Sequence, residues 1–455
     1  DWNSAADWYF HNNSGGQGSI IDSFMAENQR QGMASMITLP MLGWVSKDGK
    51  SVSYPRDAYP KQDKFEGAAG NGAWHGKNIK GDPMRTSIAI SPEWVGNWVK
   101  KLKTQFGDHP HFYILDNEPM LWNSTHRDVQ DTPVTYDYYL KKYIAYAAAV
   151  READPAAVIV GPAEWGWLGM QGSAFDMPGP WSKGVKNADK KAHGNKPFLE
   201  WFLEQVAKEE KSRKVSLLDI IDVHYYPEKG SWPGGGDGSS DVRAQLLQST
   251  RSLWDKTYKD PSWINDKIYF IPRLKAMAAK FKPEAKVSIG EYNFRAEKDP
   301  SGAIAQADVL GIMGREDLYA AEYWDFPVKD GTHRDAFALY RNFDGKGSGF
   351  GARYVPNSLG VQDDFSVFTA EDLDKKRLTI ILLNKNLSDD QEFDLQFDSY
   401  GKPTSGRVVG FNGGSSYGSM TRYETDLKEL TGIKIKTKPL SMQIVELLYG
   451  SRKKP

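Results

Sequence analysis

Up to about residue 327, short apolar runs alternate with longer segments in which apolar residues recur every three or four positions. The short runs predict buried strands, and the longer segments predict amphipathic helices. Regular alternation of the two is typical of a parallel α/β sheet or barrel. The six predicted strands end at Pro40, Asn117, Pro162, His224, Glu291 and Trp324.

Helix signals lie between these runs. Ser91 followed by Pro92 is typical of an N-cap and a first helical position, so we predict that a helix begins there. The helical spacing of its apolar residues predicts a buried face of Trp94, Trp98, Val99, Leu102 and Phe106. Further helices are predicted over residues 136–153, 197–208, 263–281 and 304–315, and a Gly/Ser loop over 230–241.

The pattern changes in the last quarter of the chain. From Ala336 onward, apolar runs are separated by turn residues, and no long amphipathic segment intervenes. This pattern predicts a small antiparallel β-sandwich. Its strands are predicted over residues 377–384, 392–397, 406–411 and 441–448. We therefore predict two domains, an α/β domain over residues 1–333 and a β-sandwich over 334–455.

Composition narrows the classes of function. A length of 455 residues is comfortable for two domains. The formal net charge of −1 argues against a nucleic-acid partner, and no apolar run approaches the roughly 18 residues of a membrane span. The absence of cysteine excludes disulfides and thiolate sites. The 15 Trp, 22 Tyr and 20 Phe favour a carbohydrate ligand, because sugar C–H faces stack on aromatic rings.

Two glutamates stand at the ends of predicted strands. Pro119 cannot continue a strand, so Asn117 and Glu118 emerge at its end, and Glu291 ends a later strand. Catalytic residues of a βα barrel lie at the carboxyl ends of the strands. Two such glutamates are the minimal equipment for glycoside hydrolysis, in which one donates a proton and the other attacks the anomeric carbon. The alternative is that both are structural, because Glu164 and Glu322 also lie near strand ends.

Several ordered segments resemble glycoside hydrolase family 44. Residues 113–127 (Tyr-Ile-Leu-Asp-Asn-Glu-Pro-Met-Leu-Trp-Asn-Ser-Thr-His-Arg) are similar to its acid/base segment, and residues 222–228 and 290–293 to its later strand ends. Residues 305–312 and 381–386 match as well, so the resemblance covers nearly the whole chain. It implies a TIM-like (β/α)8 barrel plus a C-terminal β-sandwich. It also implies a retaining endo-β-1,4-glucanase acting on cellulose-type chains, in a family whose members also accept xylan, lichenan or xyloglucan.

The resemblance also implies roles for individual residues. Glu118 matches the general acid/base, Glu291 the nucleophile, and Asn117 a residue that binds the sugar 2-hydroxyl next to the scissile bond. His224 and Tyr225 are expected beside the nucleophile. Independently of the resemblance, the position of Glu164 near a strand end makes it a candidate to line the cleft. The other residues expected to contact the glucan are Tyr292, Trp263 and Trp324, together with Trp122 and Trp165, for which a place in the core is the alternative.

One departure concerns calcium. Family members often carry Asp-Pro-x-Asp before the first long helix, where a structural calcium could be held, but here Arg85 stands in place of the second aspartate of Asp82-Pro83-Met84-Arg85. Arginine should weaken a hard-cation site. We therefore assign no metal ligand, keep structural calcium as an open expectation, and expect the chemistry to need no cofactor. We expect a secreted monomer whose partner is a β-glucan and which binds neither nucleic acid nor membrane.

A second departure is the number of strands. In retaining barrels of this type the acid/base ends the fourth strand and the nucleophile the seventh, whereas only six strand ends are predicted here. If Glu118 ends the fourth strand, two strands lie before Asp1. We therefore expect this chain to lack an N-terminal portion holding two barrel strands and one sandwich strand. A six-stranded open sheet would otherwise expose unpaired edges.

Two other functions compete with a glucanase. One is a hydrolase whose main activity is on xylan or mannan, because cleft shape decides the substrate and the sequence does not reveal it. The other is a non-catalytic glycan-binding protein on the same scaffold. Two paired strand-end glutamates argue against it, because binding needs only one hydrogen-bonding partner per hydroxyl.

Overall fold

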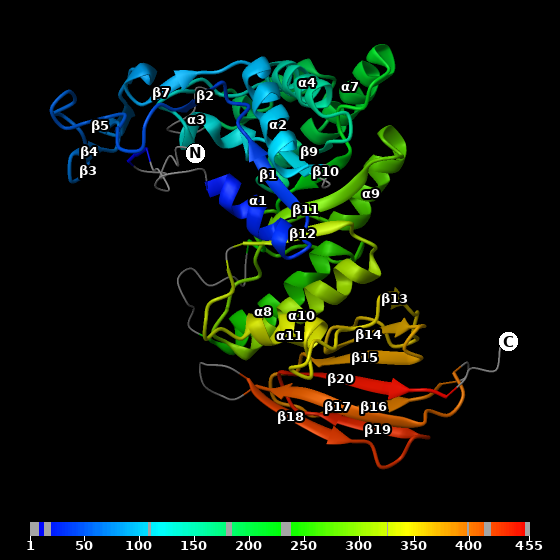
Figure 1. Ribbon diagram of the computed structural model, residues 1–455. Coiled ribbons are helices and arrows are strands. Elements are labelled where there is room, and N and C mark those ends of the chain that lie inside the picture. Colours follow the sequence, from blue (N-terminus) through cyan, green and yellow to red (C-terminus); the bar gives the residue numbers. More distant parts are fainter. Residues whose placement is uncertain are drawn as a thin grey trace. The chain divides into compact units, whose positions relative to one another are not determined.

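A computed structural model describes residues 9–12, 20–107, 111–178, 184–228, 238–324, 326–397, 400–413 and 420–450 (Figure 1). The chain forms two compact units. Unit 1 comprises Asp1–Tyr225 and Leu274–Gly290, and unit 2 comprises Tyr226–Arg273 and Glu291–Pro455. This division differs from the boundary after residue 333, which stays a prediction. Most of the predicted Gly/Ser loop over 230–241 lies outside the described residues.

The sheet expected from the apolar runs is present. Its six strands follow the chain order and are β1 (Ser35–Leu39), β8 (His111–Leu115), β9 (Val158–Glu164), β10 (Ile220–Val223), β11 (Lys286–Tyr292) and β12 (Ala320–Tyr323). The pairings from β1 through β11 are parallel. Each strand corresponds to a predicted one, and the predicted TIM-like architecture is confirmed. The two further barrel strands expected before Asp1 stay a prediction.

Helices connect the strands, as the βα pattern requires. The longer ones are α1 (Ile20–Arg30), α2 (Pro92–Phe106), α4 (Tyr136–Ala153), α7 (Phe198–Arg213), α9 (Phe270–Phe281) and α10 (Pro300–Arg315). Ser91 caps α2 as predicted, because its Oγ accepts the N–H of Trp94 at 3.2 Å. The predicted buried face of α2 is partly wrong. Trp94 is 42% exposed, and Val95 and Gly96 are buried instead.

Shorter elements fill the connections. The remaining helices are α3 (Trp122–Thr125), α5 (Trp167–Gln171), α6 (Ala188–Ala192), α8 (Ser240–Ser249) and α11 (His333–Arg341), with 3-10 turns at Pro83–Arg85, Pro119–Leu121, Ala174–Asp176 and Thr250–Leu253. Two short hairpins pair β3 (Phe65–Glu66) with β4 (Ala69–Gly70) and β5 (Ala73–Trp74) with β6 (Lys77–Asn78), and a separate two-stranded sheet pairs β2 (Trp44–Ser46) with β7 (Ser87–Ala89). No helix among the described residues is long and apolar enough to cross a membrane.

Aromatic packing fixes the helices of unit 1. Tyr139 and Tyr143 of α4 contact Phe198 and Phe202 of α7, with ring centroids 4.8–5.6 Å apart across the interface. All four rings are fully buried. Large buried rings with offset or edge contacts contribute both area and specific geometry. The cluster therefore holds α4 and α7 together, and these helices follow β8 and β9 in the chain.

The C-terminal strands form the predicted β-sandwich (Figure 1, yellow to red). One sheet has the order β13 (Arg353–Tyr354), β14 (Phe365–Asp372), β15 (Arg377–Asn384), β20 (Ser441–Leu448), β17 (Ser405–Asn412), β18 (Thr421–Asp426). A second pairs β16 (Gln391–Leu395) with β19 (Ile433–Thr437). Phe393 and Ile435 of the small sheet share one apolar core with Val367, Ile380 and Val445 of the large sheet.

A buried ion pair joins α10 to this sandwich. Lys385 Nζ lies 3.0 Å from Asp308 Oδ2, and both side chains are almost fully buried. Thr250 and Ser366 donate hydroxyl hydrogen bonds of 2.7 and 2.6 Å to the same carboxylate. A buried charge is stable only when an opposite charge and hydrogen-bond partners compensate for its loss of water. The two segments that carry part of the family resemblance, residues 305–312 and 381–386, therefore meet at this ion pair.

Candidate active site

The chain is strained where Glu118 leaves β8. Asp116 and Glu118 have φ angles of 64° and 45°, in the left-handed region that non-glycine residues seldom adopt. Such conformations cost about 1–3 kcal/mol each and persist where neighbours determine them. The Glu118 N–H donates to Ala163 O at 2.9 Å, and Asp116 Oδ2 accepts the N–H groups of Met41 and Leu42 at 2.6 and 2.7 Å. These bonds fix the direction in which Glu118 projects.

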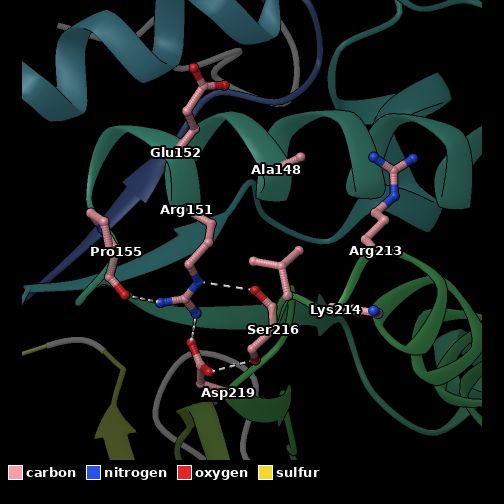
Figure 2. A pocket seen from close by; sticks show the side chains of 9 residues that line it. Ala148, Arg151, Glu152, Pro155, Arg213, Lys214, Ser216 and Asp219 are labelled. Atoms are coloured by element: carbon pink, nitrogen blue, oxygen red, sulfur yellow. Dashed lines mark hydrogen bonds and ion pairs between the residues drawn. The ribbon is translucent and has the colours of Figure 1, made fainter.

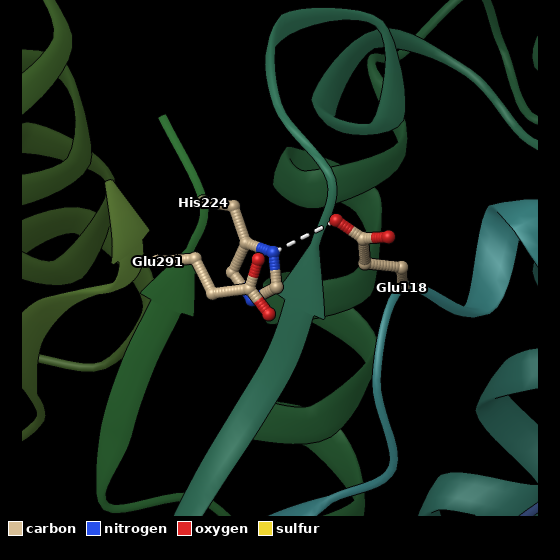
Figure 3. Close-up of side chains that lie close together, drawn as sticks. All are labelled: Glu118, His224 and Glu291. Atoms are coloured by element: carbon tan, nitrogen blue, oxygen red, sulfur yellow. Dashed lines mark hydrogen bonds and ion pairs between the residues drawn. The ribbon is translucent and has the colours of Figure 1, made fainter. Parts of the chain in front are cut away.

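His224 holds the carboxyl group of Glu118. Its Nδ1 lies 2.9 Å from Glu118 Oε1 (Figure 3). The His224 side chain is 2% exposed and that of Glu118 is 23% exposed. The His224 backbone N–H donates to Glu164 O at 2.7 Å, so consecutive carbonyls at the end of β9 (Ala163 and Glu164) hold both partners. His224 was expected beside the nucleophile, and this bond to the acid/base was not predicted.

Glu291 stands near the carboxyl end of β11, and Figure 3 labels it there. Parallel pairing sets Asp222 of β10 opposite Ser288 of β11, three residues before Glu291. The Tyr226 hydroxyl donates to Glu291 Oε2 at 2.9 Å. A donor at this position stabilises negative charge on the carboxylate and fixes its direction.

Tyr226 and Asp222 are site residues that sequence reasoning missed. A period of two along an extended chain predicts that Asp222, His224 and Tyr226 share one face. Asp222 is buried beneath the site, and Ser288 donates a hydroxyl hydrogen bond to its Oδ1. Burial raises the pKa of Asp222 while the nearby His224 lowers it. This alternation was the signal that would have found both residues.

Three aromatic residues of the predicted site are buried. Trp122 is fully buried, its ring packs against Tyr139, and its Nε1 donates to Asn117 O at 2.9 Å. It therefore braces the loop before Glu118 from inside the protein. Tyr225 and Tyr292 are each 2% exposed, and the Tyr292 hydroxyl accepts a hydrogen bond from Gln306 at 2.9 Å. None of these rings can offer its face to a polysaccharide.

Other predicted contacts remain accessible. Trp263 and Trp324 are 52% and 55% exposed, Asn117 is exposed, and Trp165 is half-buried. The Trp263 Nε1 donates to Glu228 Oε2 at 3.0 Å, which limits rotation of that indole ring. Exposed rings of limited mobility are suited to stacking on sugars. Their contact with glucan stays a prediction.

Glu164 does not line a cleft, because it is fully buried. Burial raises its pKa well above the ordinary value, and the charge of nearby Glu118 raises it further. A Cβ added at Gly169 would lie 2.6 Å from Glu164 Oε2, so glycine there makes room for the carboxyl group. Burial and the charge of Glu118 therefore both favour the protonated form of the Glu164 carboxyl group.

The raised pKa of Glu164 predicts a pH-dependent effect of Glu164→Gln on stability. The folded protein keeps a proton that the unfolded chain releases, so the associated stability is complete below the unfolded pKa of about 4.3 and is lost as pH rises. Glutamine does not titrate. The variant should gain stability relative to the native protein as pH rises, by at most about 1.4 kcal/mol per pH unit. Denaturant unfolding at several values between about pH 5 and 8 measures this difference.

Glu93→Gln is the matched control, because Glu93 is exposed on α2. Its stability difference should be independent of pH over the same range. A difference between Glu164→Gln and the native protein that stayed constant with pH would show that Glu164 does not keep its proton.

The loop considered for calcium does not fit that ion. Asp82 Oδ1 accepts the N–H of Met84 at 3.0 Å and thereby caps the turn Pro83–Arg85. Calcium takes six to eight oxygen ligands. Here the Asp82 carboxylate accepts a backbone N–H instead, and Arg85 places a guanidinium group at the end of the same turn. We assign no metal ligand to the loop. Structural calcium elsewhere stays an untested expectation.

A pocket in unit 1 lies at the other ends of the strands (Figure 2). Pro155 precedes β9, and Ser216 and Asp219 precede β10, so this pocket lies at the amino ends. Arg151 crosses it and bonds to Asp219 Oδ2 at 2.5 Å and to Ser216 O at 3.0 Å. In βα barrels this end serves stability, and the opposite end carries catalysis. We therefore assign the active site to the carboxyl ends.

Comparisons with known proteins agree with this geometry. The model of glycoside hydrolase family 44 matches residues 1–229. Endoglucanase A of Paenibacillus lautus is 32% identical over 412 residues, which cover 87% of this chain and 56% of that protein. The beta-mannanase/endoglucanase A of Caldicellulosiruptor saccharolyticus is 30% identical over 452 residues, covering 91% and 32%. The chain thus spans about half the length of the first relative and about a third of the second.

Solved structures give the same result over more of the chain. CelM2, a bifunctional glucanase-xylanase from a metagenome library, is 33% identical with a TM-score of 0.89, covering 98% of this chain and 89% of that one. A Paenibacillus polymyxa xyloglucanase of family 44, solved with xyloglucan, is 26% identical with a TM-score of 0.77, covering 98% and 90%. The sequence of the present chain, its fold and the match of the family model together show that it belongs to glycoside hydrolase family 44.

Proposed function

We propose that this protein is a retaining, endo-acting glycoside hydrolase that cleaves internal β-1,4-glucosidic bonds of cellulose-type glucans. The observation that carries the proposal is the pair of anchored carboxylates on a chain of family 44. Glu118 follows the end of β8 and bonds to buried His224, and Glu291 stands near the end of β11 and accepts a hydrogen bond from Tyr226. Carboxyl ends of parallel strands are where this fold places its chemistry.

The proposed reaction has two displacements. In the first, Glu118 gives its proton to the glycosidic oxygen as that bond breaks, and Glu291 forms a bond to the anomeric carbon. In the second, Glu118 takes a proton from water, whose oxygen replaces Glu291 at that carbon. Glu118 is thus neutral before the first step and ionised before the second. An N–H of His224 at Nδ1 supports the ionised form.

The substrate class is proposed from the exposed indoles and from the relatives. Trp263 and Trp324 offer ring faces on which a glucan can stack. CelM2 is described as a glucanase-xylanase, and the P. polymyxa enzyme as a xyloglucanase. We therefore propose β-1,4-glucans first, with xylan, lichenan and xyloglucan as further substrates. Because such polymers lie outside cells, we also propose that the protein is secreted.

A second candidate is mannan or xylan as the main substrate, because one relative is described as a beta-mannanase/endoglucanase. Reducing-sugar release from carboxymethylcellulose, xyloglucan, lichenan, xylan and mannan tests both candidates. We expect the fastest release on a β-1,4-glucan, with viscosity falling early because internal bonds are cut. Faster release on xylan or mannan would favour the second candidate. No release from any polymer would leave a glycan-binding protein.

A further inference from the structure

A buried polar network supports the backbone of Trp324 in unit 2. Its centre is Asn293, which follows Tyr292 and is 4% exposed. The Asn293 amide nitrogen donates to Trp324 O at 2.5 Å and to Glu297 Oε1 at 3.0 Å. Its Oδ1 accepts the N–H of Arg295 at 2.6 Å. Because the oxygen accepts from a backbone donor, the orientation of the amide group is fixed.

Tyr323 and His333 complete this network. The Tyr323 hydroxyl donates to Glu297 Oε1 at 2.6 Å and lies 2.6 Å from His333 Nδ1. A hydroxyl has one proton, so when it donates to Glu297, His333 must donate through Nδ1. His333 is fully buried and belongs to α11. We call Asn293, Glu297, Tyr323 and His333 the Asn293 network. Hydrogen bonds connect every member of this network to another member.

The backbone of Trp324 is held on both sides while its ring stays accessible to solvent. Its N–H donates to Tyr292 O at 2.9 Å, and its carbonyl accepts from Asn293. Trp324 is nevertheless 55% exposed. Tyr292 directly follows Glu291 in β11. The backbone that carries the exposed indole is therefore hydrogen-bonded to Tyr292, the residue next to the proposed nucleophile Glu291.

We propose that Asn293 is a positioning residue that fixes Trp324 as a sugar platform beside Glu291 and so sets the affinity for the glucan unit bound there. This inference rests on the proposed function and deepens it. A stacking platform gains affinity when its orientation is already fixed before the ligand arrives, because less freedom is lost on binding. Asn293 does not touch the sugar, and acts only through the carbonyl of Trp324.

A double-mutant cycle on KM tests the proposal. Trp324→Ala should raise KM on xyloglucan about tenfold, and Asn293→Ala about three- to tenfold, while kcat changes less than about threefold in each. In the Trp324→Ala background, Asn293→Ala should add nothing, because its effect passes through the missing ring. Asn293→Asp is a second variant. It keeps the acceptor for Arg295 and loses the donor to Trp324, so it should show the same KM pattern.

Asn384→Ala is the matched control. Asn384 is also a buried asparagine of unit 2 whose amide nitrogen donates to a backbone carbonyl, that of Asp389 at 2.9 Å, but it belongs to β15 of the sandwich. Its loss should lower stability and leave KM unchanged. Fluorine NMR of protein labelled with 5-fluorotryptophan gives a direct readout. The resonance that Trp324→Phe removes should shift or broaden in the Asn293 variants and not in Asn384→Ala.

The outcomes distinguish failure of the Asn293 proposal from failure of the proposed glycoside hydrolase function. If the native protein turns over glucan but the KM effects of Asn293→Ala and Trp324→Ala multiply, positioning through Trp324 is wrong and the proposed function stands. An unchanged KM with a lowered kcat, or an unmoved Trp324 resonance in both Asn293 variants, would also overturn it. A native protein that turns over no glycan overturns both proposals.

Discussion

Replacing Glu118 by glutamine should lower kcat/KM on unactivated glucan about 10³-fold. Glutamine keeps the size of the side chain and can still accept a hydrogen bond from His224 Nδ1, which lies 2.9 Å from the carboxylate it replaces. It cannot give a proton to the glycosidic oxygen. A sugar alkoxide is a poor leaving group, so the first displacement should become very slow. Steady-state kinetics on xyloglucan measure the loss.

The loss should depend on the leaving group. A dinitrophenyl β-cellobioside needs no protonation, so Glu118→Gln should still form the covalent intermediate on it at close to the native rate, seen as a burst of dinitrophenol. Glu93→Gln, an exposed glutamate on α2, is the matched control and should keep native activity on both substrates. Native activity of Glu118→Gln on xyloglucan would exclude it as the acid.

Replacing Glu291 by glycine should abolish turnover of every substrate, by at least about 10⁴-fold. The nucleophile is needed however good the leaving group is. Glu291→Gly should therefore be inactive on the dinitrophenyl glycoside as well, with no burst. Tyr226 would lose its hydrogen-bond partner at the same time, so glycan affinity of the variant should be measured alongside to show that the site still binds.

The contrast between the two variants separates the roles. If Glu291→Gly kept a burst on the activated substrate, it would not be the nucleophile. If both variants lost activity in proportion on all substrates, neither pattern of leaving-group dependence would hold, and the assignment of acid and nucleophile would be wrong.

Much of the fold followed from periodicity. Helix α4 (Tyr136–Ala153) and strands β15 and β20 have the predicted bounds, because long runs with a single period leave few alternatives. Strand β14 (Phe365–Asp372) was missed because it carries buried polar residues, of which Ser366 bonds to Asp308. Edge strand β18 (Thr421–Asp426) is mostly exposed and lacks an apolar face. Two-residue hairpin strands carry no period at all.

The candidate site shows a similar limit. Glu118 and Glu291 could be predicted as catalytic residues, because each lies where a proline or polar residue ends an apolar run. The accessibility of aromatic side chains could not be predicted from the sequence. Trp122 is buried and donates to Asn117 O, whereas Trp324 is exposed. Both are tryptophans near strand ends, and only tertiary packing distinguishes them. The network around Asn293 joins residues up to forty positions apart, which no local pattern encodes.

Azide rescue of two variants distinguishes the nucleophile from the acid/base. In Glu291→Gly, azide can enter the space of the nucleophile and should convert a dinitrophenyl β-cellobioside to the α-glycosyl azide, with inverted configuration. In Glu118→Ala, azide should instead attack the intermediate on Glu291 and give the β-glycosyl azide, with retained configuration. Proton NMR of the two products distinguishes the anomers. The same anomer from both variants, or rescue of neither, would contradict a double displacement in which Glu291 is the nucleophile and Glu118 the acid/base.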